Sequence, residues 1–301
     1  MSRRATGIAL ALVTATISGF AVFLNGYAVK RFDDATAYTT AKNGIAAVLL
    51  ILLALPVLIR AGSEGPAPRP RTRRHWLGLV AVGVIGGSVP FVLFFEGLAR
   101  ASSTEAAFIH KTLVIWVALL AVPLLGERLS WAHWAAIALL LAGQAVLVGD
   151  AGTMTLGSGE LMIFGATLLW SVEVVVVKRL LASLAAPTLA AARLGIGLVV
   201  LLVFVALSGR WDELTGYGAE QWGWALLTGV ILSGYVATWY AALAHAQAVD
   251  VTAVLVLAAI VTALLNAGFE GAPLDVLGLG LIVAGGALIA LRPLRPTPVP
   301  A

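Results

Sequence analysis

The chain has 301 residues, of which 60% are hydrophobic and only 11% are charged. A soluble domain carries about 25% charged residues, so this composition excludes a water-soluble globular protein and predicts a membrane protein with several helices. The absence of cysteine excludes disulfides, thiolate catalysis and cysteine-ligated metal sites. The formal net charge of +4 is too small to indicate nucleic acid, so membrane lipid is the expected surrounding partner.

Ten stretches are apolar enough to cross a bilayer as helices, a crossing that takes about 20 residues. In chain order they are Ala5–Leu24, Ala37–Ile59, Trp76–Ala99, Ala106–Leu125, Trp131–Val148, Gly159–Val177, Thr188–Leu207, Trp222–Ala244, Val251–Phe269 and Leu274–Leu291. Short connections rich in Gly, Pro or charge separate them, as at Gly62–Pro66 and Gly152–Gly157. The sequence therefore predicts one all-α membrane protein without a soluble domain.

Positive charge is distributed unevenly between the two sides that ten spans define. An even number of spans places both termini on one side, which holds twelve of the 19 lysines and arginines, including Arg60, Arg292 and Arg295, against four on the other side. Lys and Arg concentrate in cytoplasmic loops, so both termini are expected in the cytoplasm and the protein in a bacterial inner membrane. The basic linker Arg69–Arg74 is the strongest determinant; binding of anionic lipid is its alternative role.

Segments about 150 residues apart in the two halves of the chain resemble one another. The matches are Ala41–Ile45 with Ala192–Ile196, Gly83–Ile85 with Gly229–Ile231, and Lys30-Arg31 with Lys178-Arg179. The repeat unit holds five spans, and because five is odd the second copy is inverted in the membrane. Inverted repeats that enclose a site near the midplane are typical of secondary transporters. We therefore predict two inverted five-helix repeats, residues 5–149 and 158–291, around a central cavity, followed by a cytoplasmic tail at 292–301.

Particular segments add a family resemblance to this plan. The sequence Leu125-Gly126-Glu127-Arg128-Leu129-Ser130 follows the fourth span, and Leu168–Ser171 in the sixth span has its counterpart at Ile17–Gly19 in the first. With the ten spans and the duplication, these segments resemble the EamA branch of the drug/metabolite transporter superfamily. The second half departs from the pattern, since Glu270 stands alone where the first half has Glu127-Arg128.

The resemblance implies that the chain exports small metabolites through a central cavity lined chiefly by the first four helices of each half. Within the family, the length and aromatic content are most similar to the YddG-type aromatic amino acid exporters.

Several cations lie inside the spans, where an ionisable side chain costs about 2.5–3.5 kcal/mol. Lys42 and Arg193 are repeat-related, and they are predicted either to attract a substrate carboxylate or to reach the interface or the carbonyl groups of a neighbouring helix. His110 and Lys111 in the fourth span have no charged counterpart in the second half. They are candidates for contact with an asymmetric substrate, with solvation at the interface as the alternative.

Two acidic residues also lie within the spans. Glu173 in the sixth span is a candidate for proton coupling, or else the structural partner of Lys178 or Arg193. Glu96 near the end of the third span is expected to face the interface or Arg100, one helical turn further along.

Aromatic residues occur inside the third, fourth, sixth and eighth spans, away from the interfacial belt. Those of the third span share a helix face with Gly87 and lie next to Pro90, which is expected to loosen the helix. Ring faces and apolar walls suit aromatic or large apolar substrates, with ordinary helix packing as the alternative. The candidates for a cavity lining are Phe91, Phe95, Trp116, Trp170, Tyr235 and Trp239, with Phe94 and Tyr240 beside them.

Signals for an enzyme are nearly absent from the sequence. The four histidines lack metal-ligand spacing, no nucleotide-binding Gly-Lys-Ser/Thr motif occurs, and Asp33-Asp34 is a lone acidic pair, so no cofactor and no metal are expected. The predicted function is export of a small-molecule substrate, an amino acid with an aromatic or large apolar side chain, by alternating access. A broad-specificity drug or metabolite carrier, and a membrane-embedded enzyme or scaffold, are the alternatives. A monomer is sufficient for this plan.

Overall fold

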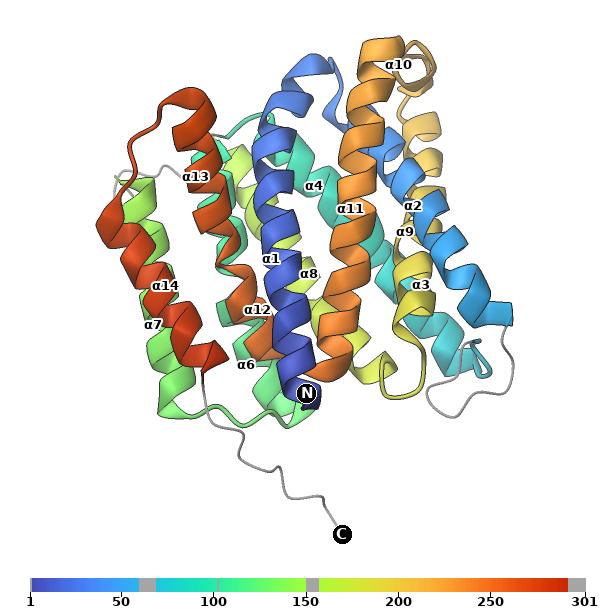
Figure 1. Ribbon diagram of the computed structural model, residues 1–301. Helices are drawn as coiled ribbons and strands as arrows, with labels where there is room; N and C mark the ends of the chain where they lie inside the picture. Colours follow the sequence, from blue (N-terminus) through green and yellow to red (C-terminus); the bar gives the residue numbers. More distant parts are fainter. Residues whose placement is uncertain (1, 60–68, 102, 150–156, 292–301) are drawn as a thin grey trace.

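The protein is a bundle of helices that pack side by side (Figure 1). The computed structural model describes residues 2–59, 69–101, 103–149 and 157–291, and it has no strand within them. The linker Gly62–Pro66, residues 150–156, the tail at 292–301 and the cation Arg60 lie outside the described residues. Nine helical stretches of the described chain are long and apolar enough to cross a membrane, and a tenth is apolar but shorter.

The helices follow the ten predicted spans. The first half contains α1 (Arg3–Ala28), the 3-10 turn η1 (Val29–Arg31), α2 (Ala35–Ile59), α3 (Arg73–Gly87), α4 (Val89–Leu98), α5 (Ser103–Lys111), α6 (Leu113–Leu125) and α7 (Trp131–Val148). The second half contains α8 (Ser158–Leu180), α9 (Ala186–Leu207), α10 (Trp211–Thr215), α11 (Ala219–His245), α12 (Ala248–Leu255), α13 (Ala258–Glu270) and the shorter α14 (Val276–Ala290).

Three of the spans consist of two helices each. The third span breaks at Ser88, two residues before Pro90, whose ring supplies no N–H for a helical hydrogen bond. The fourth span breaks at Thr112 and the ninth at Val256 and Leu257, where hydrogen bonds to the third preceding residue replace the α-helical pattern. The breaks in the fourth and ninth spans occupy equivalent places in the two halves. They interrupt the bundle near the middle of its length.

The last helices of the two halves, α7 and α14, pack against each other and run in opposite directions. A β-carbon at Gly143 would lie 2.6 Å from the carbonyl oxygen of Gly278, and one at Gly285 would lie 2.9 Å from that of Ala136. Residues late in α7 therefore meet residues early in α14, and the reverse. This is the pairing expected of equivalent helices related by a two-fold axis in the membrane plane.

The repeat-related basic pairs lie at opposite ends of the continuous helix α11. Arg31 forms an ion pair with Glu220 at the start of α11. Lys178 donates hydrogen bonds of 2.5 Å to the carbonyl oxygens of Leu243 and Ala246 at its end. The two halves are therefore inverted relative to each other, as predicted. We call the end of the bundle that holds Lys178 and the start of α1 the N side, and the end that holds Arg31 the far side (Figure 1).

The first helix of each half packs against the third span of the other half, α1 against α11 and α8 against α4. Apolar side chains lie on the outer surface of the bundle, where Leu53 and Val199 are each 60% exposed. Polar and charged side chains such as Lys42 and Arg193 are buried instead. An apolar exterior around a partly polar interior is the distribution that a lipid surrounding requires. The chain is an integral membrane protein.

Candidate functional site: a central cavity between the two halves

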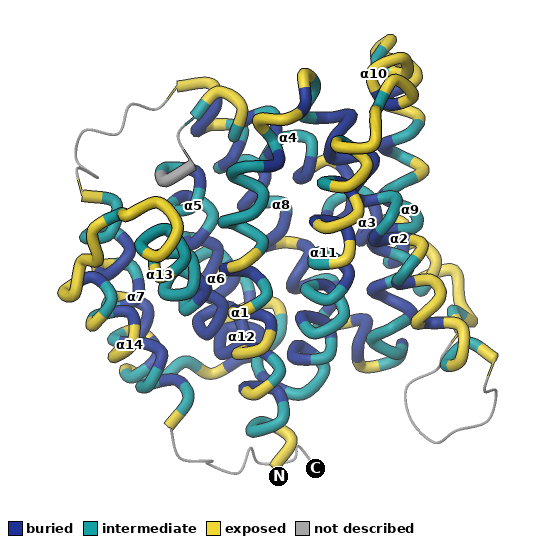
Figure 2. The backbone as a smooth tube through the Cα atoms, turned by 45° about the horizontal axis from the view of Figure 1, so that its top comes forward, coloured by how far each residue is buried: buried dark blue, intermediate teal, exposed yellow. Residues whose placement is uncertain are grey.

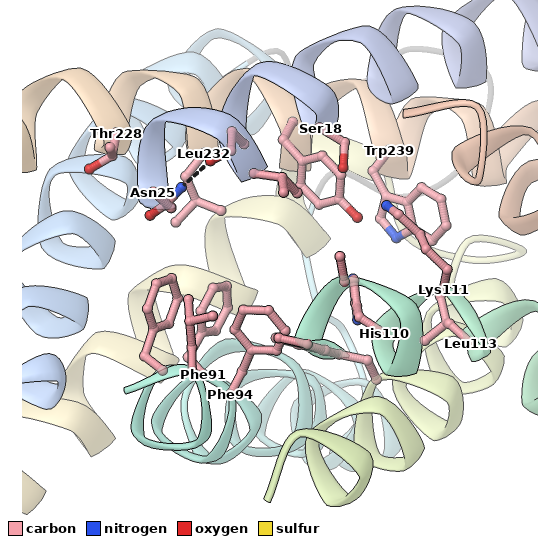
Figure 3. A pocket seen from close by; sticks show the side chains of 18 of the residues that line it. Ser18, Asn25, Phe91, Phe94, His110, Lys111, Leu113, Thr228, Leu232 and Trp239 are labelled. Carbon is pink, nitrogen blue, oxygen red and sulfur yellow. Dashed lines mark hydrogen bonds between the residues drawn. The ribbon is translucent and has the colours of Figure 1, made fainter. Parts of the chain in front are cut away.

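A cavity of about 150 Å³ lies at the centre of the bundle. Its walls come from α1, α2, α4, α5 and α6 of the first half and from α8, α9 and α11 of the second half. Figure 3 shows Ser18 and Asn25 on α1 facing Phe91 and Phe94 on α4 across this space. Ten of the eleven residues predicted from the sequence line it: Lys42, Phe91, Phe95, His110, Lys111, Trp170, Glu173, Arg193, Tyr235 and Trp239.

Trp116 is the predicted residue that does not line the cavity. Its indole packs edge-on against Phe164 with ring centroids 5.5 Å apart, and its Nε1–H donates to the hydroxyl of Thr112. The break at Thr112 starts a new helix, so the direction in which Trp116 points does not follow from the helical phase of His110 and Lys111.

One wall of the cavity is a cluster of aromatic rings centred on Trp170. The rings of Phe91, Phe94 and His110 lie 5.0–5.5 Å from that of Trp170 between centroids, in edge-on or tilted contacts. On another wall, Tyr235 and Trp239 stack at 6.1 Å. Such arrangements are favourable for aromatic pairs and present ring faces and edges to a ligand.

The break in the third span helps to position this cluster. In an unbroken helix the N–H of residue 90 would donate to the carbonyl of Gly86, but Pro90 has no N–H. The Gly86 oxygen instead accepts hydrogen bonds from Trp170 Nε1 and from Arg193 Nε, both at 3.1 Å. Gly87 lies directly against the backbone of α9, where a side chain would have no room. Because Pro90 has no N–H, the carbonyl oxygen of Gly86 is left free to accept hydrogen bonds from two side chains of the other half.

Lys42 lies in a pocket of aromatic rings. Its Nζ is 3.6 Å from the ring centroid of Phe95 and 5.1 Å from that of Tyr38, and it is 3.4 Å from Asn25 Oδ1. An ammonium over a ring face is stabilised by the negative charge density of the ring. The predicted alternative of reaching the interface is not observed, because the side chain is almost fully buried.

Arg193, at the position equivalent to Lys42, has an acidic partner instead. Its Nη1 is 3.9 Å from Glu173 Oε1, and Glu173 also accepts a hydrogen bond from the hydroxyl of Tyr240. Of the two structural partners predicted for Glu173, Arg193 is the one observed, because Lys178 donates to backbone carbonyls on the N side. Arg193 and Glu173 are both buried, so each offsets the charge of the other.

Asn25, Ser18 and Thr228 also line the cavity and were missed by the analysis of charges and aromatics. Asn25 Oδ1 accepts a hydrogen bond of 2.7 Å from the hydroxyl of Tyr38, which in turn lies 3.0 Å from the hydroxyl of Thr228. Ser18 and Asn25 are seven residues apart, two helical turns, so they share a face of α1. That spacing of polar residues in an apolar span was the available signal.

A second cavity of about 390 Å³ adjoins the first and extends to the far side. The two share Val22, Gly26, Ala107 and Lys111 in their linings. The second cavity reaches Glu270 at the end of α13 and Ala272, Pro273 and Asp275 beyond it, as well as α1, α5 and α7. The central cavity therefore communicates with the far side through the sector formed by these helices.

The N side is closed by buried polar contacts between the halves. Asp250 on α12 is 1% exposed, and its carboxylate lies 2.9 Å from Arg4 Nε and 3.3 Å from His133 Nε2. His133 Nδ1 accepts the N–H of Ser130, so the imidazole presents Nε2–H to Asp250. All eight residues of α12 are buried (Figure 2). The helix α12 therefore plugs the N side beneath the cavity.

Glu127, in the loop between α6 and α7, caps the start of α12. Its two carboxylate oxygens accept the backbone N–H groups of Ala248 and Val249 at 2.6 and 3.1 Å. Burial raises the pKa of Glu127, although both N–H donors and the nearby Lys178 act to lower it. Glu270 has a different role, since it accepts a hydrogen bond from the hydroxyl of Tyr27 on the far side. The two glutamates therefore make different contacts.

Two inverted halves that enclose a charged and aromatic cavity at the centre of the bundle, open toward one side, are the architecture of a secondary transporter. The EamA-like transporter family model matches the chain twice, over residues 5–149 and 157–291, and the chain belongs to this family. A protein described as "Uncharacterized transporter in cobO 3'region" from Sinorhizobium sp is 27% identical over 99 residues, which are 33% of this chain and 70% of that protein.

A solved structure described only as "Crystal structure of protein" has the same fold. It superposes with a TM-score of 0.74 at 19% identity and covers 96% of this chain and 98% of its own.

Proposed function

We propose that this transporter exports amino acids with aromatic or large apolar side chains from a bacterial cytoplasm by alternating access. The observation that carries the proposal is the aromatic cluster around Trp170, with Lys111 and His110 at its edge. A substrate ring would bury its apolar area against these rings, while its polar end would lie toward the cations. The two repeats, 5–149 and 158–291, would move relative to each other so that the cavity opens first to one side and then to the other.

The transport assignment is tested with purified protein in proteoliposomes, by exchange of internal phenylalanine for labelled external phenylalanine. Trp170→Ala removes a ring from the cavity and is expected to weaken apparent affinity about tenfold, since an aromatic pair contributes up to about 1.5 kcal/mol. Trp116→Ala is the matched control, because that indole lies outside the cavity. The proposal is wrong if no amino acid is exchanged. Equal inhibition by chemically unrelated compounds would indicate a broad-specificity carrier instead.

We further propose that both termini are cytoplasmic, in the inner membrane. The support is the excess of Lys and Arg on the N side. Because the chain has no cysteine, Lys30→Cys and Lys178→Cys each introduce one labelling site. In intact cells, an impermeant maleimide is expected to label the protein at position 30 only. Labelling at position 178 alone would reverse the orientation.

Glu173 is our candidate for proton coupling, because it is the one acidic side chain among the described residues that line the central cavity. Its contacts with Arg193 and Tyr240 also make it a structural partner. Glu173→Gln separates the two roles: loss of proton-driven uptake with retained amino acid exchange supports coupling. Loss of both, with a lowered melting temperature, supports a structural role alone.

A further inference from the structure

The three basic side chains that line the central cavity differ in how their charge is satisfied. Lys42 lies against aromatic rings and near Asn25. Arg193 pairs with Glu173 and donates to a backbone carbonyl. Each of these two cations therefore has a partner within the protein, whatever the cavity contains.

Lys111 has no such partner. Its side chain is 5% exposed, and its Nζ has no hydrogen-bond acceptor among the residues that the structure describes. The neighbouring His110 Nδ1 is likewise buried without a hydrogen-bond partner in the described part of the chain. An ammonium removed from water without an acceptor is strongly unfavourable, so a site built in this way is completed by an anion.

The rest of the described lining has no unpaired carboxylate that could bind a positively charged ligand. Against Lys42, Lys111 and Arg193, the described lining contains one carboxylate, Glu173. That carboxylate already faces Arg193 and accepts the hydroxyl of Tyr240. A zwitterion would place its carboxylate well on Lys111, but its ammonium would enter a cavity with an excess of positive charge.

The location of Lys111 supports the same conclusion. It lines both the central cavity and the second cavity that extends to the far side, and it follows His110, whose ring touches the aromatic cluster. A ligand with its ring against Trp170 and Phe94 therefore has Lys111 within the same space, on the path toward the far side. Figure 3 shows Phe94, His110 and Lys111 around this space.

From this geometry we infer that the preferred substrate is an organic anion: an aromatic or large apolar body with a carboxylate and no ammonium beside it. Lys111 binds the carboxylate, and the rings around Trp170 bind the body. The inference rests on the proposed function in taking the central cavity as the transport site. It keeps the aromatic or apolar body and the carboxylate of the proposed amino acid substrate, and it differs in that the preferred substrate lacks the ammonium.

The test compares three ligands that share a phenyl ring: 3-phenylpropionate, phenylalanine, which adds an ammonium, and phenethylamine, which lacks the carboxylate. Binding to the purified full chain is followed by the change in its tryptophan fluorescence, since two of the nine tryptophans, Trp170 and Trp239, line the cavity. Binding is preferable to flux here, because weak acids and amines cross lipid bilayers unaided. We expect 3-phenylpropionate to bind at least tenfold more tightly than phenylalanine, and phenethylamine to bind most weakly.

Lys111→Met is expected to lower the affinity for 3-phenylpropionate at least tenfold and to erase its advantage over phenylalanine, while Lys111→Arg retains part of it. Without ligand, Lys111→Met is expected to melt at the same or a higher temperature, because it removes an unpaired buried charge. Arg74→Met, at an exposed position outside the linings of both cavities, is the control and is expected to change affinity less than twofold.

Equal affinities for 3-phenylpropionate and phenylalanine, or unchanged binding in a folded Lys111→Met protein, would overturn the anion inference and leave the proposed function standing. If none of the ring compounds binds, the proposed function fails and the inference fails with it.

Discussion

The ion pair between Arg4 and Asp250 tests whether buried contacts hold the N side closed. Asp250→Asn keeps the shape of the side chain but removes the charge that faces Arg4 Nε at 2.9 Å. Breaking a buried pair costs about 3–5 kcal/mol, and we take about 3 because the Arg4 side chain is 22% exposed and keeps part of its hydration. A loss of about 3 kcal/mol in the closing equilibrium raises the open population about 100-fold.

Opening of the N side can be followed through one introduced cysteine, since the chain has none of its own. Val249 is fully buried on α12, so Val249→Cys reacts with a maleimide only when that side opens. Asp250→Asn is expected to raise the labelling rate about 100-fold when labelling tracks the open population. The control is Glu220→Gln, which breaks the exposed pair with Arg31 and is expected to change the rate less than about fivefold, since surface pairs are worth about 0–1 kcal/mol.

A second reporter separates opening from unfolding. Thr36 is fully buried near the far side, and a cysteine there is expected to stay unreactive in Asp250→Asn. If Asp250→Asn and Glu220→Gln have equal effects, burial does not decide the strength of these contacts and our reasoning is refuted. Rapid labelling at position 36 as well would show that the variant loses its fold rather than its N-side closure.

Two further predictions follow from the loops and the glycine contacts. Gly143→Ala is expected to destabilise the protein by about 1–3 kcal/mol in chemical unfolding, because its β-carbon would overlap α14. Gly280→Ala, which meets no neighbour within 4 Å, is expected to be neutral or stabilising by up to about 1 kcal/mol; equal losses in both would contradict this account. The raised pKa of Glu127 means that its contribution to N-side closure is fully present below the ordinary value of 4.5 and is lost as pH rises through the raised value. Labelling at Val249→Cys is therefore expected to rise with pH above 4.5 more steeply than in Glu127→Gln, which serves as the reference for ionisation of the thiol, and parallel profiles would exclude Glu127.

Hydropathy was sufficient to predict the spans, and the internal repeat of five spans predicted the inversion, but neither predicted all the interruptions of the spans. Pro90 indicated the break at Ser88, because proline has no N–H for the helical hydrogen-bond pattern. Around Thr112 and Leu257 the sequence contains neither Gly nor Pro, so no local residue marks the break. Both breaks contain hydrogen bonds to the third preceding residue, and they lie at equivalent places in the two halves. This agreement indicates that the tertiary packing of the repeat determines where these helices break.

The candidate site was predictable where charge or aromaticity stood out against an apolar span. Lys111 and Trp170 are examples, and both line the cavity. Asn25 and Thr228 carry weaker signals, because short polar side chains often bond to their own helix, as Asn25 also does with the carbonyl of Ala21. Trp116 could not be placed from the positions of His110 and Lys111. The helix breaks at Thr112, so side chains after the break no longer follow the helical periodicity of those before it.

The two halves share a backbone plan, so the differences between their side chains decide what the cavity can hold. Lys42 and Arg193 are equivalent by sequence, yet one lies against aromatic rings and the other faces a carboxylate. Lys111 has no equivalent, and among the three cations of the central cavity it is the one that also lines the far-side cavity. Closure of the far side must therefore change the surroundings of Lys111 more than those of Lys42 or Arg193. A ligand shifts a conformational equilibrium only through its different affinities for the two states. An anion held by Lys111 would therefore couple substrate binding to closure of the far side.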